Sequence, residues 1–445
     1  MLRIALLCAA LALPTAGFAT SQESVLFSFP STRGFSAGAT PEAGLLTDGA
    51  GNLYGTTSAG GAFACNCGVV FMLSPPASGG TVWTETILHV FRGYPGDGGI
   101  PLAALAFDRA GDLYGTTMIG GAEQAGTVFK LTRPQAGQTQ WTESLLYEFS
   151  GTSADGRFPF SSLVFDAAGN LYGTSFLGGA NDQGLAYELV PPAGGGTGWS
   201  LIPMHAFAGG SDGANPVSAL TFDAQGNLYG TTFSDGVTGT SGGTLFRLVF
   251  AGGSVSETVL HTFTAADIKG QGVPFDGGLP YGNLVLDSLG NIYGTTLIGG
   301  GGQIIPGEAS NAGTVFEVTP PSSGGTVWHE RLLHSFNGDT GNRYTADGAS
   351  PYGGVFLDAA GNLYGTTAQG GLNNEGTVFK LAPPAAGSTS WTQTVLHNFR
   401  GFPDGAGPFG ALVLGTSGLL YGVTSSGTSL SVNADQIGTV YAITP

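Results

Sequence analysis

Short runs of alternating apolar and polar residues fill this chain, and Gly, Pro or Asp bounds each run. This pattern predicts β-strands joined by tight turns. The segment Leu-Tyr-Gly-Thr-Thr, or a close variant of it, occurs seven times at intervals of 57 to 71 residues. Its tyrosines are Tyr54, Tyr114, Tyr172, Tyr229, Tyr293, Tyr364 and Tyr421. A repeat of this length indicates one array of similar small units.

Each repeat contains four strand-like segments. An apolar run ending in Asp comes first, as at 163–166, and Asn-Leu-Tyr-Gly-Thr follows, as at 170–174. The third segment reads Gly-Thr-Val-Phe-x-Leu, as at 126–131, and the fourth ends in Phe, as at 394–399. Asp-x-x-Gly-Asn joins the first two segments. It predicts a hairpin, because Asp accepts backbone N–H groups and Gly tolerates positive φ.

Four-stranded units repeated side by side predict an all-β fold, a seven-bladed β-propeller with four strands per blade. The last repeat has no fourth segment after it, but residues 24–29 match that segment and precede the first repeat. We expect this N-terminal strand to complete blade seven and close the ring without a free sheet edge. Residues 20–445 then form one domain. Its expected blades cover residues 43–91, 102–149, 160–207, 217–263, 281–336, 352–399 and 409–443.

Residues 1–19 have the features of a secretory signal peptide. Arg3 provides the positive start, residues 4–13 the apolar core and residues 17–19 a small-residue cleavage site. We therefore expect a secreted or periplasmic protein. The apolar run is too short to span a bilayer, so we expect no membrane span. We also expect a monomer.

The formal net charge of −17 argues against nucleic acid and anionic membranes as partners. Cations, proteins and neutral glycans stay open. Acidity that keeps an exported protein soluble is the simpler interpretation.

The compound motif Asp-x-x-Gly-Asn-Leu-Tyr-Gly-Thr-Thr-x-x-Gly-Gly followed by Gly-Thr-Val-Phe-x-Leu, as at 358–371 and 376–381, resembles the GloVer-type tandem repeat of exported bacterial proteins. The resemblance covers nearly the whole chain after the signal. It implies export and a propeller-like fold and brings no activity with it. The first two segments are also similar to those of lactonase-type propellers.

Histidine and tryptophan recur at fixed places and favour packing between blades. Five histidines stand two residues before the terminal Phe of the fourth segment, where other repeats have Tyr147 and Phe27. These histidines are His89, His205, His261, His334 and His397. Residues two apart share a strand face, and replacement by aromatic residues favours packing over metal binding. The tryptophans, eight residues before the same Phe, are interpreted in the same way.

An Asp-Gly-x-x-Pro motif precedes most first segments, and Ala37 replaces its Asp before blade one. Its aspartates are Asp97, Asp155, Asp212, Asp276, Asp347 and Asp404. If they surround the central channel, their carboxylates could bind Ca²⁺. Alternatively, each Asp satisfies the N–H groups of its own turn.

Three long connections around blade five interrupt the repeat and carry our candidate ligand-binding residues. Charged, amide and aromatic groups together suit a polar or glycan-like ligand, although tolerated loop growth explains the insertions equally well. The candidates are Asp267, Lys269, Gln303, Glu308, Asn311, Arg343 and Tyr344.

Cys65 and Cys67 are the cysteines left after signal removal, and we expect a local disulfide between them in an oxidising compartment. So short a ring adds little stability. A two-thiolate metal site is the alternative.

The chain shows no nucleophile–base motif, no His-Glu-x-x-His and no phosphate-binding Gly loop. We therefore predict a secreted, non-enzymatic repeat protein that binds a protein or glycan through the loop face of the propeller, without a catalytic residue or resident cofactor. The alternatives are a metal-dependent propeller enzyme of the lactonase or lyase kind and a purely structural protein of the envelope or matrix.

Overall fold

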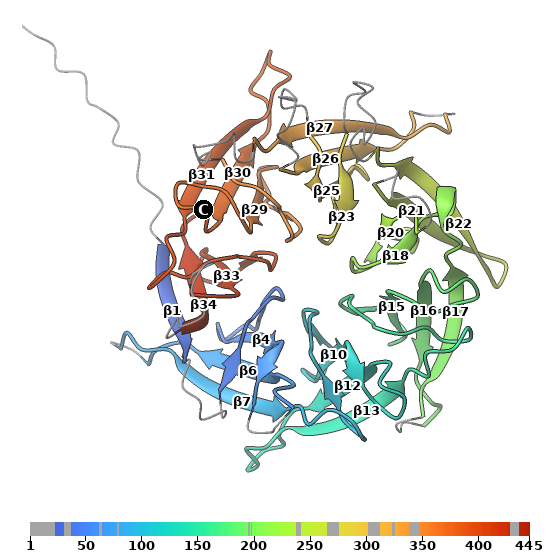
Figure 1. The fold of residues 1–445 in the computed structure, drawn as a ribbon, viewed down its shortest axis with the longest axis vertical. Helices are drawn as coiled ribbons and strands as arrows, with labels where there is room; N and C mark the ends of the chain where they lie inside the picture. Colours follow the sequence, from blue (N-terminus) through green and yellow to red (C-terminus); the bar gives the residue numbers. More distant parts are fainter. Residues whose placement is uncertain are drawn as a thin grey trace, which may run out of the picture.

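Seven antiparallel sheets stand around a central axis in the computed structural model, which confirms the seven-bladed propeller (Figure 1). The structure describes residues 23–30, 37–61, 65–77, 80–194, 196, 198–236, 242–264, 276–300, 312–322, 325–337, 347–427 and 436–445. The proposed signal, residues 1–19, lies outside these ranges. Among the described residues, no helix has the length and apolar character that a membrane span requires.

Each blade has four strands, which run from a short strand at the channel to a long strand at the rim (Figure 1). Blade one consists of β3 (Leu46–Thr47), β4 (Leu53–Thr57), β6 (Val69–Ser74) and β7 (Thr84–Val90). Blade two consists of β9 (Ala106–Phe107), β10 (Leu113–Thr117), β12 (Thr127–Thr132) and β13 (Thr142–Glu148). Blade three consists of β14 (Val164–Phe165), β15 (Leu171–Ser175), β16 (Leu185–Val190) and β17 (Ser200–Ala206). Blade four consists of β19 (Thr221–Phe222), β20 (Leu228–Ser234), β21 (Thr244–Ala251) and β22 (Ser254–Thr262). Blade five consists of β24 (Val285–Leu286), β25 (Ile292–Ile298), β26 (Thr314–Thr319) and β27 (His329–Ser335). Blade six consists of β28 (Phe356–Leu357), β29 (Leu363–Thr367), β30 (Thr377–Ala382) and β31 (Thr392–Asn398). Blade seven consists of β32 (Val413–Leu414), β33 (Leu420–Thr424), β34 (Gln436–Ile443) and β1 (Glu23–Pro30).

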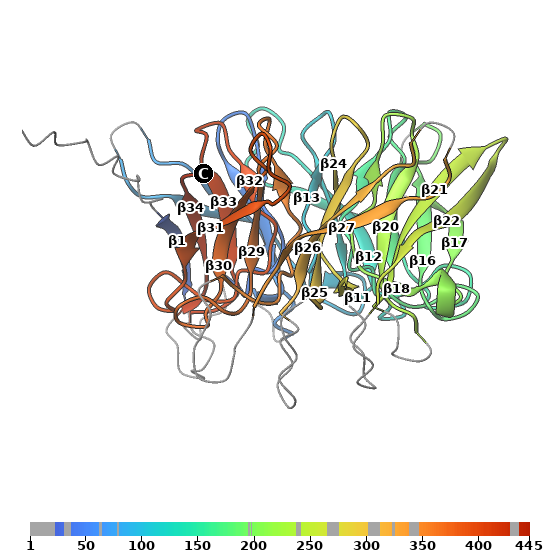
Figure 2. The same cartoon turned by 90° about the horizontal axis from the view of Figure 1, so that it is seen from above.

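Short strands line the connections between blades. These are β2 (Gly38–Ala39) with β5 (Ala59–Gly60), β8 (Gly98–Gly99) with β11 (Ile119–Gly120), β18 (Ala214–Pro216) on β20, β23 (Gly278–Pro280) on β25, and the 3₁₀ turn η1 (Gly210–Asp212). Seen from the side, β24 and β32 lie toward one face of the ring, and β11 and β18 lie toward the other (Figure 2).

The N-terminal strand β1 closes the ring by pairing with β34. Their antiparallel register places Ser24 opposite Ala442 and Ser28 opposite Thr439. Phe29 of β1 is fully buried and packs edge-on against Phe71 of blade one, with ring centroids 5.2 Å apart. The first described strand therefore holds the last blade to the first.

The five letters of the repeat each have a structural role, and blade one shows them. Leu53 is fully buried in the layer between blades. Tyr54 packs edge-on against Phe107 of the next blade, with centroids 5.1 Å apart. A Cβ at Gly55 would lie 2.6 Å from Phe71 Cζ, so no larger residue fits there.

The two threonines complete the motif with hydrogen bonds. The Thr56 hydroxyl donates to the Ala103 carbonyl of the next blade at 3.2 Å. The second threonine binds within its own blade, as where the Thr117 and Thr127 hydroxyls lie 2.8 Å apart and fully buried. Leu-Tyr-Gly-Thr-Thr is thus a packing motif, and functional differences between blades must lie elsewhere.

Candidate functional site

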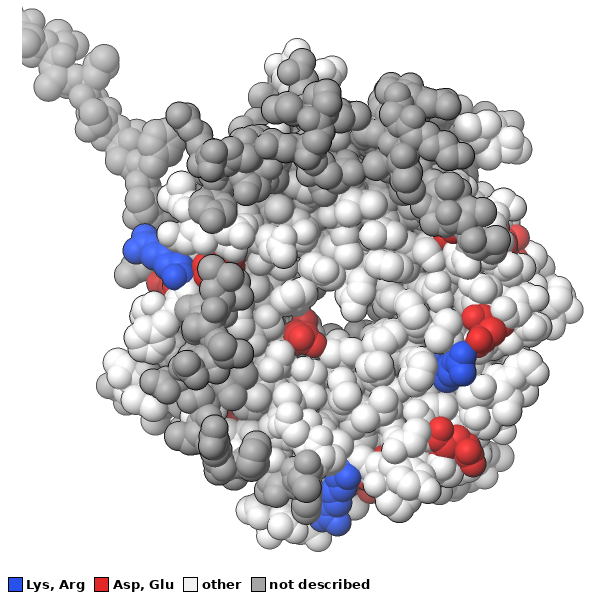
Figure 3. All heavy atoms as spheres, viewed as in Figure 1, with Lys and Arg blue, Asp and Glu red and all other residues white. Residues whose placement is uncertain are grey.

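The residue after the proline that leads into each blade faces the central channel, and its type varies among the blades. We call this set of seven residues the channel mouth: Glu42, Leu102, Phe160, Val217, Tyr281, Tyr352 and Phe409. They contribute to a cavity of about 220 Å³ along the axis. Figure 3 shows the central opening, with acidic atoms beside it and mostly uncharged residues around it.

Three neighbouring blades place aromatic rings in a row along one side of the channel mouth. Tyr281 lies 5.3 Å from Tyr352, and Tyr352 lies 4.7 Å from Phe409, between ring centroids. Each ring is partly exposed to the channel. Glu42 of blade one follows Phe409 around the ring, so the row ends at a carboxyl group.

The channel mouth is weakly charged. Among the described residues that line the channel, Glu42 is the one carboxyl group, and Lys, Arg and His do not occur. Burial raises the pKa of Glu42, although a hydrogen bond with Ser58 opposes the shift. Burial, followed by the nearby charge of Glu42, raises the pKa of Tyr281 to about 12. The phenol therefore stays protonated at neutral pH and can donate a hydrogen bond.

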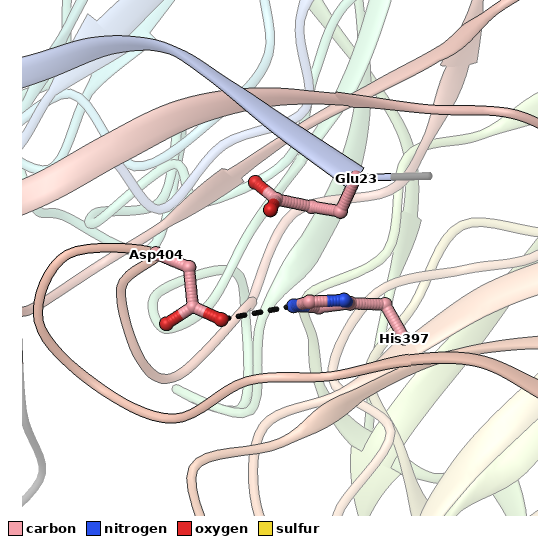
Figure 4. Close-up of side chains that lie close together, drawn as sticks. All are labelled: Glu23, His397 and Asp404. Carbon is pink, nitrogen blue, oxygen red and sulfur yellow. Dashed lines mark hydrogen bonds and ion pairs between the residues drawn. The ribbon is translucent and has the colours of Figure 1, made fainter. Parts of the chain in front are cut away.

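The outer wall carries a second set of polar groups, which we call the interblade triads. Each triad joins the histidine of one fourth strand, the aspartate of the following connection and a glutamate from the fourth strand of the next blade. The triads are His89–Asp97–Glu143, His205–Asp212–Glu257, His261–Asp276–Glu330 and His397–Asp404–Glu23. In Figure 4, the side chains of Glu23, His397 and Asp404 converge from β1, β31 and the loop after β31.

The aspartates of the Asp-Gly-x-x-Pro motif lie in six separate connections and not around the channel. None of the six is among the residues that line the channel in the described part of the chain. Asp97 illustrates their position: it accepts the Arg92 and Gly98 backbone N–H groups at 2.8 and 2.6 Å, beside His89. The placement around the channel is thus corrected, because each turn directs its Asp toward the outer strand; Ca²⁺ binding by these residues stays a prediction.

Packing accounts for the rings of the repeated histidines and tryptophans. Each histidine lies edge-on to the Phe two residues later, with centroids 4.8 Å apart. Trp141 of blade two packs against Tyr54 of blade one at 6.4 Å, and the other tryptophans repeat this contact between blades. The histidine Nε2 atoms have a second role beside the aspartates, which the spacing did not reveal.

The candidate ligand-binding residues of the loops around blade five lie outside the described residues, and their role stays a prediction. These are Asp267, Lys269, Gln303, Glu308, Asn311, Arg343 and Tyr344. Cys65 and Cys67 form a disulfide with Cα atoms 5.2 Å apart. Cys67 is buried next to Gly93 and Gly99, so the disulfide anchors a loop of blade one.

The channel mouth and the triad glutamates were not found in the sequence. The channel mouth has no motif, because its seven positions hold five different residue types. The signal would have been this variability at a fixed distance from the proline that leads into each blade. The triad glutamates occupy one position of the fourth strand, which also holds Leu201 and Gln393. Only the blade arrangement brings them to the histidines.

Fold and repeat together define the chain as a seven-bladed repeat propeller. A family model, described as the Gloeobacter/Verrucomicrobia repeat, matches residues 15–166, 66–303, 134–346 and 305–445. The chain therefore belongs to the Gloeobacter/Verrucomicrobia repeat family. No curated protein matches its sequence.

Solved structures of other proteins are similar to this one. A fungal alcohol oxidase of the AA5 family in complex with copper matches with a TM-score of 0.54 and 14% identity, over 96% of this chain and 77% of its own. The PQQ-bound aldose sugar dehydrogenase from Streptomyces coelicolor matches with a TM-score of 0.44 and 14% identity, over 76% of this chain and 93% of its own. At these identities the likeness concerns the fold alone.

Proposed function

We propose that this protein is an exported, non-enzymatic binding propeller that holds the end of a glycan in its channel mouth. The observation that carries the proposal is the row Tyr281–Tyr352–Phe409, which ends at Glu42. The second strands of the blades repeat one packing motif, and a scaffold gains function where its repeated positions diverge.

The chemistry of the channel mouth suits a sugar ring. A sugar presents apolar C–H faces and hydroxyl edges, and partly exposed aromatic rings with a few polar groups match such a surface. Glu42 and the tyrosine hydroxyls supply these polar groups. A cavity of about 220 Å³ takes one ring, and the rest of the glycan extends away from the opening.

The alternatives need features that the described channel does not offer. A metal-dependent lactonase or lyase needs several acidic and amide ligands on the axis, whereas Glu42 and Asn283 stand alone there among the described lining residues. The Asn283 oxygen also accepts the Ala219 backbone N–H at 2.9 Å. A purely structural protein would need no divergence at the channel mouth.

A glycan screen followed by calorimetry tests the proposal. We expect Tyr352→Ala to weaken binding of the selected glycan about tenfold or more, as loss of a central aromatic anchor does. Leu372→Ala, at an exposed residue outside the channel, is the matched control and should bind like the parent. Undiminished binding by the double variant Tyr281→Ala/Tyr352→Ala would refute this site, and a screen in which no glycan binds would refute the glycan as the ligand.

A further inference from the structure

The interblade triads bring three metal-ligating atoms together from two blades. In the triad of blades one and two, His89 Nε2 lies 3.5 Å from Asp97 Oδ2 and 3.6 Å from Glu143 Oε1. In this triad the separations exceed a good hydrogen bond, whereas in the other three triads the histidine Nε2 and an aspartate oxygen lie 2.9–3.0 Å apart, at hydrogen-bond distance. The separations around His89 Nε2 resemble the distances of about 3.3–3.5 Å between neighbouring ligand atoms of a tetrahedral zinc ion with bonds of about 2.0–2.2 Å.

Every triad contains a buried oxygen without a hydrogen-bond partner. The unpartnered atoms are Oε1 of Glu23, Glu143, Glu257 and Glu330. Two boundaries without a full triad also hold an unpartnered atom, Glu85 Oε1 and His334 Nε2. In the first triad His89 Nε2 is also buried and without a partner. Buried polar atoms without partners are rare in native proteins, and an ion at the centre of each triad would satisfy them.

The remaining blade boundaries show which combinations the chain uses. Where Tyr147 replaces the histidine, its hydroxyl donates to Asp155 at 3.1 Å and Leu201 takes the glutamate position. Where Phe27 replaces it, Ala37 replaces the aspartate. Each of the two boundaries that lack the histidine therefore also lacks one of the two carboxylates.

Between blades five and six the chain keeps two of the three ligands. His334 Nε2 lies 3.5 Å from Asp347 Oδ2, but Gln393 stands where the glutamate would be, and its Nε2 donates to the Asp347 carbonyl at 3.1 Å. This boundary is an internal reference that differs from a triad by one carboxylate.

We propose that each interblade triad is a site for a divalent transition-metal ion, Zn²⁺ or Mn²⁺, which braces two neighbouring blades at the outer wall. One imidazole nitrogen and two carboxylate oxygens suit these ions, whereas Ca²⁺ takes six to eight oxygens. Backbone N–H groups orient the aspartates, as Thr264 N does for Asp276 Oδ1 at 2.8 Å. Water completes the coordination.

Titration of the chelator-stripped protein with Zn²⁺ alone tests the proposal through stoichiometry. We expect about four ions per chain. Glu330→Gln should lower this to about three, because it removes one anionic ligand with little change of shape. Gln393→Glu should raise it to about five by completing the reference boundary.

Two further measurements make the result decisive. Glu85→Gln is the control and should leave the stoichiometry unchanged, because Glu85 holds the same strand position at the boundary where Phe27 and Ala37 replace the histidine and the aspartate. Co²⁺ should give visible absorption bands that lose about one quarter of their intensity in Glu330→Gln. Absence of tight binding, or one stoichiometry for all variants, overturns the proposal. Neither result bears on glycan binding at the channel mouth.

Discussion

The Tyr229 hydroxyl donates a hydrogen bond to Asp223 Oδ2 at 3.1 Å and so ties the second strand of blade four to the hairpin before it. The same Tyr–Asp pair occurs in blades one to six, at 3.0 to 3.2 Å. In blade seven the Tyr421 hydroxyl instead lies 2.9 Å from the hydroxyl of Ser417. The same tyrosine hydroxyl therefore has a charged partner in blades one to six and a neutral partner in blade seven.

Tyr229→Phe should lower the free energy of unfolding by about 1–2 kcal/mol at pH 7, since a hydrogen bond to a carboxylate is stronger than one to a neutral group. Tyr421→Phe should cost less, about 0.5–1 kcal/mol. Urea unfolding of both variants checks the order. A loss at Tyr421 equal to that at Tyr229 would show that the charge of the acceptor adds nothing to this hydrogen bond.

Acid should weaken this hairpin. Burial would raise the pKa of Asp223, but hydrogen bonds from Asn227, Tyr229 and the Gln225 N–H group outweigh it and lower the pKa below the usual value of 3.8. The carboxylate then contributes stability above the unfolded pKa, and this contribution disappears as pH falls through the folded pKa. Relative to the parent, Asp223→Asn should be destabilised at pH 7 and less so near pH 2. Thermal melting at both pH values measures the change, and a constant difference between the two proteins would contradict it.

Periodicity predicted the ring because the packing contacts themselves repeat. Tyr54, Gly55 and their equivalents fit the same surroundings in every blade, so strand order and closure by β1 followed from counting segments. The candidate sites were harder to predict for the opposite reason. Glu42 and Tyr281 stand at one position in two blades that are far apart in the sequence, and their relation exists only across the closed ring.

The position of Asp97 shows the same limit at the outer wall. Its motif predicted a turn, and the turn is present, but the direction of the side chain depends on where His89 and Glu143 lie in three dimensions. The distance along the chain between histidine and aspartate also varies, from 7 residues for His205 to 15 for His261. No fixed spacing could therefore reveal the pair.

Glu85 should make the stability depend on pH in the neutral range. Burial raises the pKa of Glu85 to about 7, and at its boundary Phe27 and Ala37 occupy the positions of the histidine and the aspartate. The folded state keeps the proton where the unfolded chain, with a pKa near 4.5, loses it, so stability falls as pH rises from about 4.5 to 7. Glu85→Gln removes this penalty. We expect its melting temperature to exceed that of the parent at pH 8 and to match it near pH 4.

The exposed Glu123 provides the control for this pH profile. Glu123→Gln should follow the parent at both pH values, because an exposed carboxylate pays no burial penalty in the folded state. If Glu85→Gln also follows the parent, the carboxylate of Glu85 is solvated in the folded protein and carries no burial penalty.

Closure by β1 makes Phe29 different from its equivalents in the other blades. Phe29→Ala removes a fully buried ring and should cost about 3–5 kcal/mol, as should Phe149→Ala in blade two. β13 of blade two pairs with the strand that precedes it in the chain, whereas β1 pairs with β34, from the other end of the sequence, and contacts blade one through Phe29 and Phe71. Loss of Phe29 should therefore release β1 and expose the edge of β34 to other molecules.

Light scattering under mild heating should show association of Phe29→Ala before global unfolding, and Phe149→Ala should stay monomeric until it unfolds. Equal behaviour of the two variants would mean that the strand pairing alone, without Phe29, keeps the ring closed.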